Sequence, residues 1–198
     1  YLMTKIISQG MARGQFNVIS FYASRANRIL PALIALSLVL LVFGWFFLTP
    51  SIYKELGTHI ASSVSFLSNI LYWLQTDYFS PSANEKWLLH TWSLSVEWQF
   101  YLLYPLILIA IASFTKIENT KYFILCLALL GYFYSLFATS ISPNASYYFL
   151  PSRAWEMLAG GIVYLFPLKL NNRQKEKLFF LGLFFIFASY FYISKDVA

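Results

Sequence analysis

The chain has 198 residues, of which 59% are hydrophobic and 11% are charged, whereas a soluble domain usually carries about 25% charged residues. Its 14 basic and 8 acidic side chains are too few to cover a soluble globule. This composition excludes a disordered chain and, despite a net charge of +6, a soluble nucleic-acid-binding protein. The single cysteine, Cys126, excludes an internal disulfide framework and a cysteine-rich metal site. We therefore expect an integral membrane protein or part of one.

Five segments are long and apolar enough to cross a bilayer, whose ~30 Å hydrocarbon core takes about 20 residues of helix. In chain order they are residues 29–48, 92–114, 122–142, 147–168 and 178–194. A further segment, residues 58–75, has the length of a span but holds one histidine, four serines and one asparagine. We expect an all-α fold, a polytopic transmembrane helix bundle with five spans.

The basic residues indicate how the segment 58–75 is placed, because lysine and arginine concentrate in cytoplasmic loops. Four basic and no acidic residues precede the first span, and residues 169–177 carry four bases against one acid. Both regions are therefore expected inside, which requires an even number of spans between them. Leaving 58–75 out of the count gives an even number. We expect it to be an interfacial or re-entrant helix on the outer side, with His59 at the interface and residues 49–91 and 143–152 outside.

One helix face in the second predicted span is polar, and ionisable groups at membrane depth are costly and often mark functional sites. Its residues, spaced by three or four positions, are His90, Ser93, Glu97, Tyr101 and Tyr104. A second charged pair, Arg153 and Glu156, stands at the outer end of the fourth span. The glycines at 160 and 161 let another helix approach just below this pair. Both groups can meet in one outward-facing cavity.

Each of these charged residues also has a structural interpretation. Arg153 and Glu156 can simply neutralise each other. Glu97 can be the partner of a buried arginine, and His90, close to Trp92, can belong to the aromatic belt at the membrane interface. The pattern alone leaves these alternatives open.

A third feature lies before the first span, where Arg25 and Arg28 are three residues apart. They share one helix face and can bind a phosphate group through their planar guanidinium forks. The alternative is plain anchoring at the cytoplasmic face, with side chains that snorkel to the headgroups. No metal site is expected, because the two histidines are far apart in the sequence.

Three stretches of the sequence resemble conserved blocks of the bacterial acyltransferase family 3 membrane proteins, which include O-antigen O-acetyltransferases. Residues 88–102 (LLHTWSLSVEWQFYL) resemble the hallmark stretch of the family. Residues 21–31 (FYASRANRILP) resemble its cytoplasmic Arg-x-x-Arg motif, and residues 152–160 (SRAWEMLAG) resemble its third block. One departure is Trp98, at a position where many members have a second glutamate.

The resemblance implies a ten-helix acyltransferase domain, of which residues 1–198 would form the middle part, without the N-terminal and C-terminal helices. It implies transfer of an acyl group, with acetyl favoured, from cytoplasmic acyl-CoA such as acetyl-CoA to a hydroxyl of an extracytoplasmic glycan such as lipopolysaccharide O-antigen. The bacterial inner membrane is the expected location. The expected partners are membrane lipid, the glycan acceptor and acyl-CoA, with no bound cofactor and no nucleic acid. A fragment of this extent is not expected to be active alone.

The resemblance, together with the chemistry of acyl transfer, assigns expected roles to these residues. His90 or Glu97 would supply or orient the base, unless a histidine of the family's first helix is the base, and Arg153 would stabilise the oxyanion. Arg25 and Arg28 would hold the CoA phosphates. Substrate contacts are expected from Trp92, Ser93, Tyr101 and Glu156.

Two other functions compete with acyl transfer. A transporter would line its path with the polar stripe, but it needs inverted repeats and paired discontinuous helices. Only one candidate kink, at Pro105, is found in the sequence, without a symmetric mate. A purely structural membrane subunit needs buried charges that neutralise one another. Labelling of a glycan that depends on acyl-CoA would separate the three functions.

Overall fold

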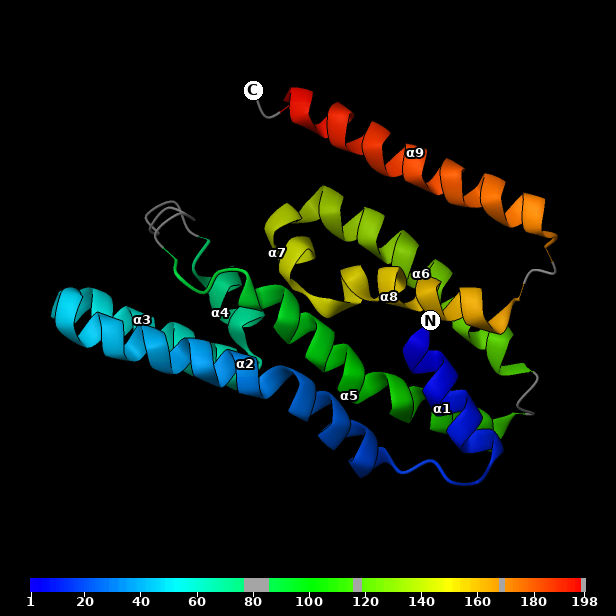
Figure 1. The fold of residues 1–198 in the computed structure, drawn as a ribbon, viewed down its shortest axis with the longest axis horizontal. Helices are drawn as coiled ribbons and strands as arrows, with labels where there is room; N and C mark the ends of the chain where they lie inside the picture. Colours follow the sequence, from blue (N-terminus) through cyan, green and yellow to red (C-terminus); the bar gives the residue numbers. More distant parts are fainter. Residues whose placement is uncertain (77–85, 116–118, 168–169, 197–198) are drawn as a thin grey trace. The chain divides into compact units, whose positions relative to one another are not determined.

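The computed structural model describes residues 1–76, 86–115, 119–167 and 170–196, with side chains up to residue 191. These residues form helices and contain no strand, which confirms the all-α class. The helices are α1 (Leu2–Ala12), α2 (Val18–Phe47), α3 (Pro50–Val64), α4 (Ser68–Leu74), α5 (Thr91–Phe114), α6 (Thr120–Ile141), α7 (Pro143–Tyr148), α8 (Leu150–Leu165) and α9 (Asn172–Asp196) (Figure 1).

The chain divides into two compact units, Tyr1–Leu165 and Phe166–Ala198. The first unit contains α1 to α8. The second contains α9, whose large apolar side chains between Leu178 and Phe191 are exposed all along the helix. Helix α9 is not among the helices that are long and apolar enough to count as candidate spans, so the predicted fifth span stays a prediction.

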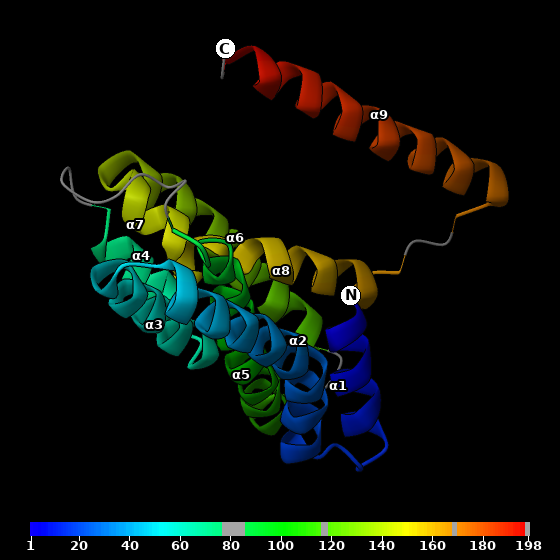
Figure 2. The ribbon, with the colours of Figure 1, turned by 60° about the vertical axis from the view of Figure 1, so that its left-hand side comes forward.

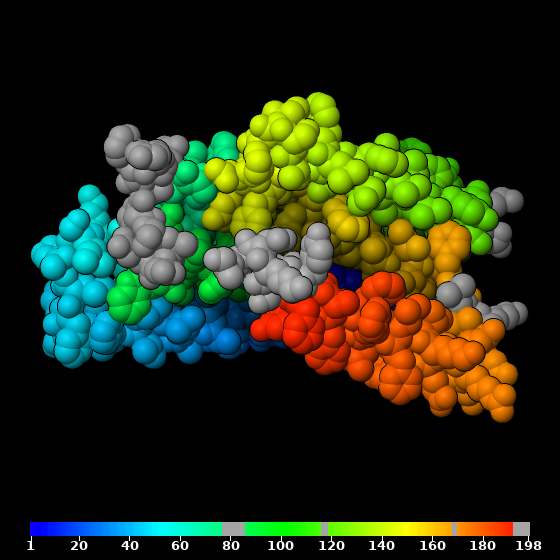
Figure 3. Space-filling model, turned by 90° about the horizontal axis from the view of Figure 1, so that it is seen from above, coloured from blue at the N-terminus to red at the C-terminus, as the bar shows by residue number. Residues whose placement is uncertain are grey.

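Three helices of the described chain, α2, α5 and α6, are long and apolar enough to cross a membrane. They correspond to the first three predicted spans. Much of their surface is apolar and exposed, as on α6, which Figure 3 shows at the surface of the molecule. The predicted fourth span is divided between α7 and the 16-residue α8, so that no single long helix forms it. The count of five spans therefore stays a prediction.

Helix α2 begins at Val18, well before residue 29, where the first span was expected to start. The Asn17 side chain caps the helix by accepting a hydrogen bond from the Ser20 backbone N–H at 3.0 Å, which satisfies one of the free N–H groups of the first turn. Arg25 and Arg28 consequently lie within the helix, not in front of it. This placement decides where their side chains point.

The segment 58–75, expected to be one interfacial or re-entrant helix, is broken into α3 and α4. The break is at Phe66, whose backbone adopts a left-handed φ of 56°. Helix α3 packs back along α2 (Figure 1), and the contact is close because a Cβ atom on Gly44 would lie only 2.8 Å from the Tyr53 ring. Neither α3 nor α4 is a candidate span. The relation of these helices to the membrane stays a prediction.

His59, in the segment expected at the membrane interface, is buried between helices, and its position relative to the membrane stays a prediction. Only 2% of the residue is exposed, and its Nε2 atom lies 3.1 Å from Oε1 of Gln75 and 3.7 Å from Oε1 of Glu55. Lys86 binds the same region, since its Nζ atom donates to the Gln75 carbonyl at 3.0 Å. Burial lowers the pKa of the Lys86 ammonium group. The polar side chains of this segment therefore form contacts that join α3, the end of α4 and Lys86.

Helix α5 packs against α2, α3, α4, α6, α7 and α8 (Figures 1 and 2). One face of it, formed by Thr91, Ser95 and Gln99 at steps of four residues, joins α5 to α3 and α4 through buried and partly buried hydrogen bonds. These bonds are Ser63 to Thr91 at 2.7 Å, Ser68 to Ser95 at 2.7 Å, and Gln99 to Asn69 at 2.9 Å. Buried polar groups are costly unless they are paired. This pairing fixes the rotation of α5 and leaves another of its polar faces free for a cavity.

Candidate active site

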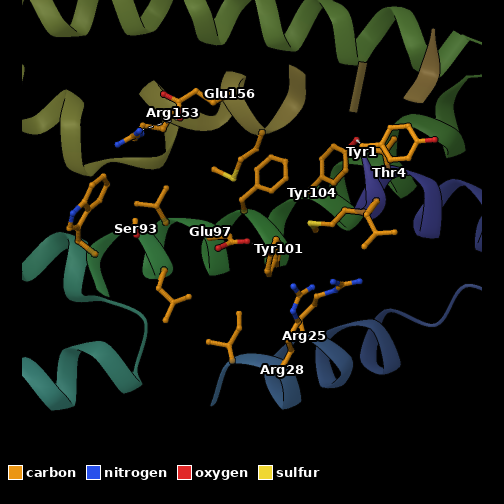
Figure 4. Close-up of a pocket in the computed structure, with 18 of the residues that line it drawn as sticks. Tyr1, Thr4, Arg25, Arg28, Ser93, Glu97, Tyr101, Tyr104, Arg153 and Glu156 are labelled. Carbon is orange, nitrogen blue, oxygen red and sulfur yellow. Dashed lines mark hydrogen bonds and ion pairs between the residues drawn. The ribbon is translucent and has the colours of Figure 1, made fainter. Parts of the chain in front are cut away.

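A cavity of about 770 Å³ is lined by residues of α1, α2, α5, α7 and α8. In Figure 4, Glu97 and Tyr101 of α5 lie between the arginines of α2 and the Arg153–Glu156 pair of α8. The polar, charged and amphipathic residues that line the cavity are Tyr1, Thr4, Arg25, Arg28, Trp92, Ser93, Glu97, Tyr101, Tyr104, Tyr147, Arg153 and Glu156. Stretches far apart in the sequence thus meet around one space.

The α5 wall of the cavity follows from the helical period. Ser93, Glu97, Tyr101 and Tyr104 recur at steps of three or four residues and therefore share a face. The Tyr101 hydroxyl donates a hydrogen bond to the Glu97 carboxylate one turn earlier. Tyr104, which is 1% exposed, exchanges a hydrogen bond of 2.8 Å with the Thr4 hydroxyl of α1. The face thus carries one carboxylate with an oriented phenol beside it.

The α2 wall supplies two positive charges. Arg25 is 8% exposed, its guanidinium lies 5.3 Å from the centre of the Phe21 ring, and its buried Nε atom has no hydrogen-bond partner. In the described part of the chain neither Arg25 nor Arg28 forms a salt bridge. The cavity lining holds Arg25, Arg28 and Glu97, and the remaining charged pair, Arg153 and Glu156, is neutral, so one positive charge is left in excess. This end of the cavity is suited to an anion.

The α8 wall supplies a paired charge. Nη2 of Arg153 lies 3.2 Å from Oε2 of Glu156, as expected for residues three apart on a helix. The Arg153 guanidinium also lies 5.0 Å from the Trp92 ring centre and 5.6 Å from that of Tyr147. Contact with two aromatic faces holds a cation in place. Arg153 is therefore positioned by three side chains from α5, α7 and α8.

Helix α1 packs closely against α8 beside the cavity, because α8 has a glycine, Gly161, at the point of contact. A Cβ atom on Gly161 would lie 2.8 Å from Oγ1 of Thr4 and 3.0 Å from the Tyr104 hydroxyl. The close approach of another helix at the two glycines is thus confirmed, and the approaching helix is α1. Only a residue without a side chain leaves room for the Thr4–Tyr104 hydrogen bond.

The cavity includes eight of the nine residues expected at the site, and the exception is His90. His90 is exposed and caps α5, which begins at Thr91. Its carbonyl accepts a hydrogen bond from the Ser93 hydroxyl at 3.0 Å. His90 stands at the N-cap with helical backbone angles, φ −63° and ψ −12°, but its side chain is exposed and does not line the cavity. Its expected role together with Glu97 and Arg153 stays a prediction.

The structure also changes the expected arrangement of the charged groups. Arg25 and Arg28 were expected on the inner side, apart from an outer cluster around Glu97 and Arg153. They line the same cavity as that cluster. Both arginines lie within α2, which packs against α5, the helix that carries Glu97.

Some lining residues had no place among the expected site residues. Tyr104 was part of the stripe, so its spacing could have included it. Thr4 and Tyr147 come from helices whose position depends on tertiary packing, and the only sequence signal for the approach of α1 was the glycine pair.

The acyltransferase domain family matches residues 1–194. The chain belongs to this acyltransferase family. All three stretches that resemble family 3 blocks contribute to the one cavity, through Arg25 and Arg28, through Glu97 and its neighbours, and through Arg153. The family and the apolar helices together make this acyltransferase a membrane protein.

Several relatives of this acyltransferase have related sequences. A Haemophilus influenzae protein described as uncharacterized is 32% identical over 215 residues, covering 100% of the chain and 85% of that protein. The O-acetyltransferase OatA of Staphylococcus aureus is 34% identical over 110 residues, covering 54% of the chain and 18% of OatA. The peptidoglycan O-acetyltransferase OatA of Listeria monocytogenes is 27% identical over 177 residues, covering 84% of the chain and 28% of OatA. The chain thus matches less than a third of each OatA protein, and no solved structure matches it.

Proposed function

We propose that this acyltransferase moves an acetyl group from cytoplasmic acetyl-CoA to a hydroxyl of an extracytoplasmic glycan, as a multi-pass protein of the bacterial inner membrane. The observation that supports the proposal is that one cavity is lined by two arginines without a salt bridge in the described chain, Arg25 and Arg28, by the Glu97 carboxylate, and by Arg153. The printed names of the relatives support O-acetyl transfer, and one of them names peptidoglycan. Lipopolysaccharide O-antigen and peptidoglycan are the two acceptors to compare. Neither transport nor a purely structural role has an observation of comparable weight.

The donor end of the cavity is assigned to Arg25 and Arg28. CoA carries several phosphate groups, and guanidinium forks bind phosphate through paired, charge-assisted hydrogen bonds. Because no salt bridge occupies either arginine in the described chain, both are available to an anionic donor. Positive charge at this end would hold the donor with its thioester toward Glu97.

The transfer step is assigned to Glu97 and Arg153. The acceptor hydroxyl oxygen attacks the thioester carbonyl carbon while its proton passes to a base, here the Glu97 carboxylate that Tyr101 orients. The resulting oxyanion is stabilised by a nearby positive charge, here Arg153. The intermediate collapses as the C–S bond breaks, and the proton returns to the CoA thiolate. If the base lies elsewhere in the protein, Glu97 would orient it.

The test is transfer of labelled acetyl from acetyl-CoA by the full-length protein in vesicles that contain either acceptor. The Glu97→Gln variant should lose transfer by about 100-fold or more, because the amide keeps the shape but cannot accept the proton. Glu176→Gln, at the exposed start of α9, is the matched control and should transfer normally. Full activity of Glu97→Gln would remove Glu97 from the chemistry. No transfer by the wild-type protein to either glycan would refute the function.

A further inference from the structure

A second, smaller pocket of about 250 Å³ lies where α6, α7 and α8 meet. Its lining is unusually rich in hydroxyl groups for a protein whose surface is mostly apolar. They belong to Ser135, Thr139, Ser146, Tyr147 and Ser152. Arg153 and Glu156 complete the lining as a charge pair. The pocket therefore offers many hydrogen-bonding groups without a net charge.

The pocket exists because α6 and α8 are in close contact at one level and α7 separates them at the next. A Cβ atom on Gly131 of α6 would lie 3.3 Å from Cβ of Trp155 on α8. Ser135 and Thr139 follow Gly131 at steps of four residues, so they continue the same face of α6. Helix α7 directly follows α6 and contacts both α6 and α8. A gap lined by polar side chains is the result.

Hydrogen bonds fix the walls of this pocket. The Thr139 hydroxyl lies 2.8 Å from that of Ser146, and the Ser152 hydroxyl donates to the Ser146 carbonyl at 2.5 Å. Ser146 is 8% exposed and Ser152 is 2% exposed. Ser135, by contrast, has no hydrogen bond of its own within the described chain. The pocket is thus a formed site in which some hydroxyl groups remain available to a ligand.

The wall between this pocket and the large cavity is shared. Tyr147, Arg153 and Glu156 line both of them. Arg153 lies against Trp92 on the cavity side and is paired with Glu156. A ligand in the small pocket would therefore reach the charged pair from the side opposite to Arg25 and Arg28.

The lining indicates the class of ligand. A phosphate or a free carboxylate needs unpaired positive charge, but Arg153 is already paired with Glu156. A purely apolar ligand would leave the hydroxyl groups without partners, which is unfavourable. A neutral sugar fits both conditions, because its hydroxyl groups donate and accept hydrogen bonds. The Tyr147 side chain, 52% exposed, offers an aromatic face of the kind that amphipathic ligands pack against.

We propose that the pocket between α6, α7 and α8 binds a neutral sugar unit of the glycan acceptor and directs one of its hydroxyl groups toward the Arg153–Glu156 pair. This inference rests on the proposed function, since it gives that function a separate acceptor subsite. The donor and the acceptor then enter from opposite sides of one charge pair. Ser135 is a specificity-determining residue of the subsite.

The experiment blocks the pocket after folding. In the full-length protein with Cys126→Ser, Ser135→Cys is reconstituted and then modified with N-phenylmaleimide. Ser140→Cys, an exposed position on α6 that does not line the pocket, is the matched control. The acceptor probe is the cell-envelope glycan fraction of the bacterium, and the donor is labelled acetyl-CoA. Modification at Ser135→Cys should raise KM for the glycan by about tenfold or more, because a filled pocket loses the sugar contacts, while Kd for acetyl-CoA changes by less than about twofold.

The outcomes separate this inference from the proposed function. An unchanged KM for the glycan after modification at Ser135→Cys would overturn the inference, whatever happens to kcat. An equal loss of affinity for acetyl-CoA would also overturn it, because the pocket would then not be separate from the donor site. Absence of transfer by the unmodified wild-type protein would instead refute the proposed function.

Discussion

Glu97 is a carboxylate in a helix that is apolar enough to cross a membrane, where a charge at mid-depth costs about 2.5–3.5 kcal/mol on insertion scales. Tyr101, one turn further along α5, donates a hydrogen bond to it, and Arg25 and Arg28 of α2 line the same cavity without forming a salt bridge with it. Helical spacing predicted that Tyr101 shares the face of Glu97. The identity of the arginines in this cavity could not be predicted, because they are far from Glu97 in the sequence and only packing brings them to one cavity.

Lysine at the two arginine positions tests whether they bind the donor or only anchor the protein. In the full-length protein, Arg25→Lys or Arg28→Lys should raise KM for acetyl-CoA by about tenfold, which is about 1.4 kcal/mol. Lysine keeps the charge but loses the planar fork that binds phosphate. Steady-state kinetics measures the change, and Arg173→Lys at the exposed start of α9 is the control. Normal KM values with lysine at both positions would leave these arginines with an anchoring role.

Helix α5 shows how one element can carry two polar faces with different tasks. The face that contains Glu97 and Tyr101 lines the cavity, whereas the face that contains Thr91, Ser95 and Gln99 is hydrogen-bonded to α3 and α4. Both faces have a helical spacing, and only the first was predicted from the sequence. Periodicity tells which residues share a face, but not whether that face meets a cavity, another helix or lipid.

Gly161 is the position where packing between α1 and α8 can be tested. Gly161→Ala should lower the free energy of unfolding by about 1–3 kcal/mol, because a Cβ atom would clash with the hydrogen-bonded Thr4 and Tyr104 side chains. Gly57→Ala on α3 is the control, since a Cβ atom there meets nothing within 4 Å. That change should instead stabilise by about 0.5–1 kcal/mol, because glycine weakens a helix. Thermal unfolding of the detergent-solubilised full-length protein measures both, and equal effects would contradict the packing.

At the scale of the whole molecule, orientation rests on the distribution of basic residues. Two segments with the length of a span are interrupted, residues 58–75 by the break at Phe66 and residues 147–168 by the division between α7 and α8. Residues 77–85, in the loop expected outside, are not among the described residues. Chemical labelling is therefore the direct measure of orientation.

Single cysteines in a full-length protein in which Cys126 and any cysteine outside residues 1–198 are replaced by serine should show the orientation. Ser51→Cys and Asn144→Cys are expected to react with a membrane-impermeant maleimide added outside, because both follow helices expected to end on the outer side. Asn172→Cys, the first residue of α9 and part of the basic region 169–177, should react only after the membrane is permeabilised. Labelling of Ser51→Cys and Asn144→Cys from opposite sides would show that an odd number of crossings separates them, and the expected orientation would then be wrong.

The sequence by itself determined the class of this protein and most of its site. Low charge and long apolar runs require a membrane helix bundle, and the spacing of Ser93, Glu97 and Tyr101 places them on one face in any helix. Tertiary structure alone decided that Arg25 and Arg28 share a cavity with Arg153, and that His90 does not. The physical reason is that a helical period relates residues only within one helix. Relations between helices depend on close contacts such as those at Gly44 and at Gly161, which local spacing does not encode.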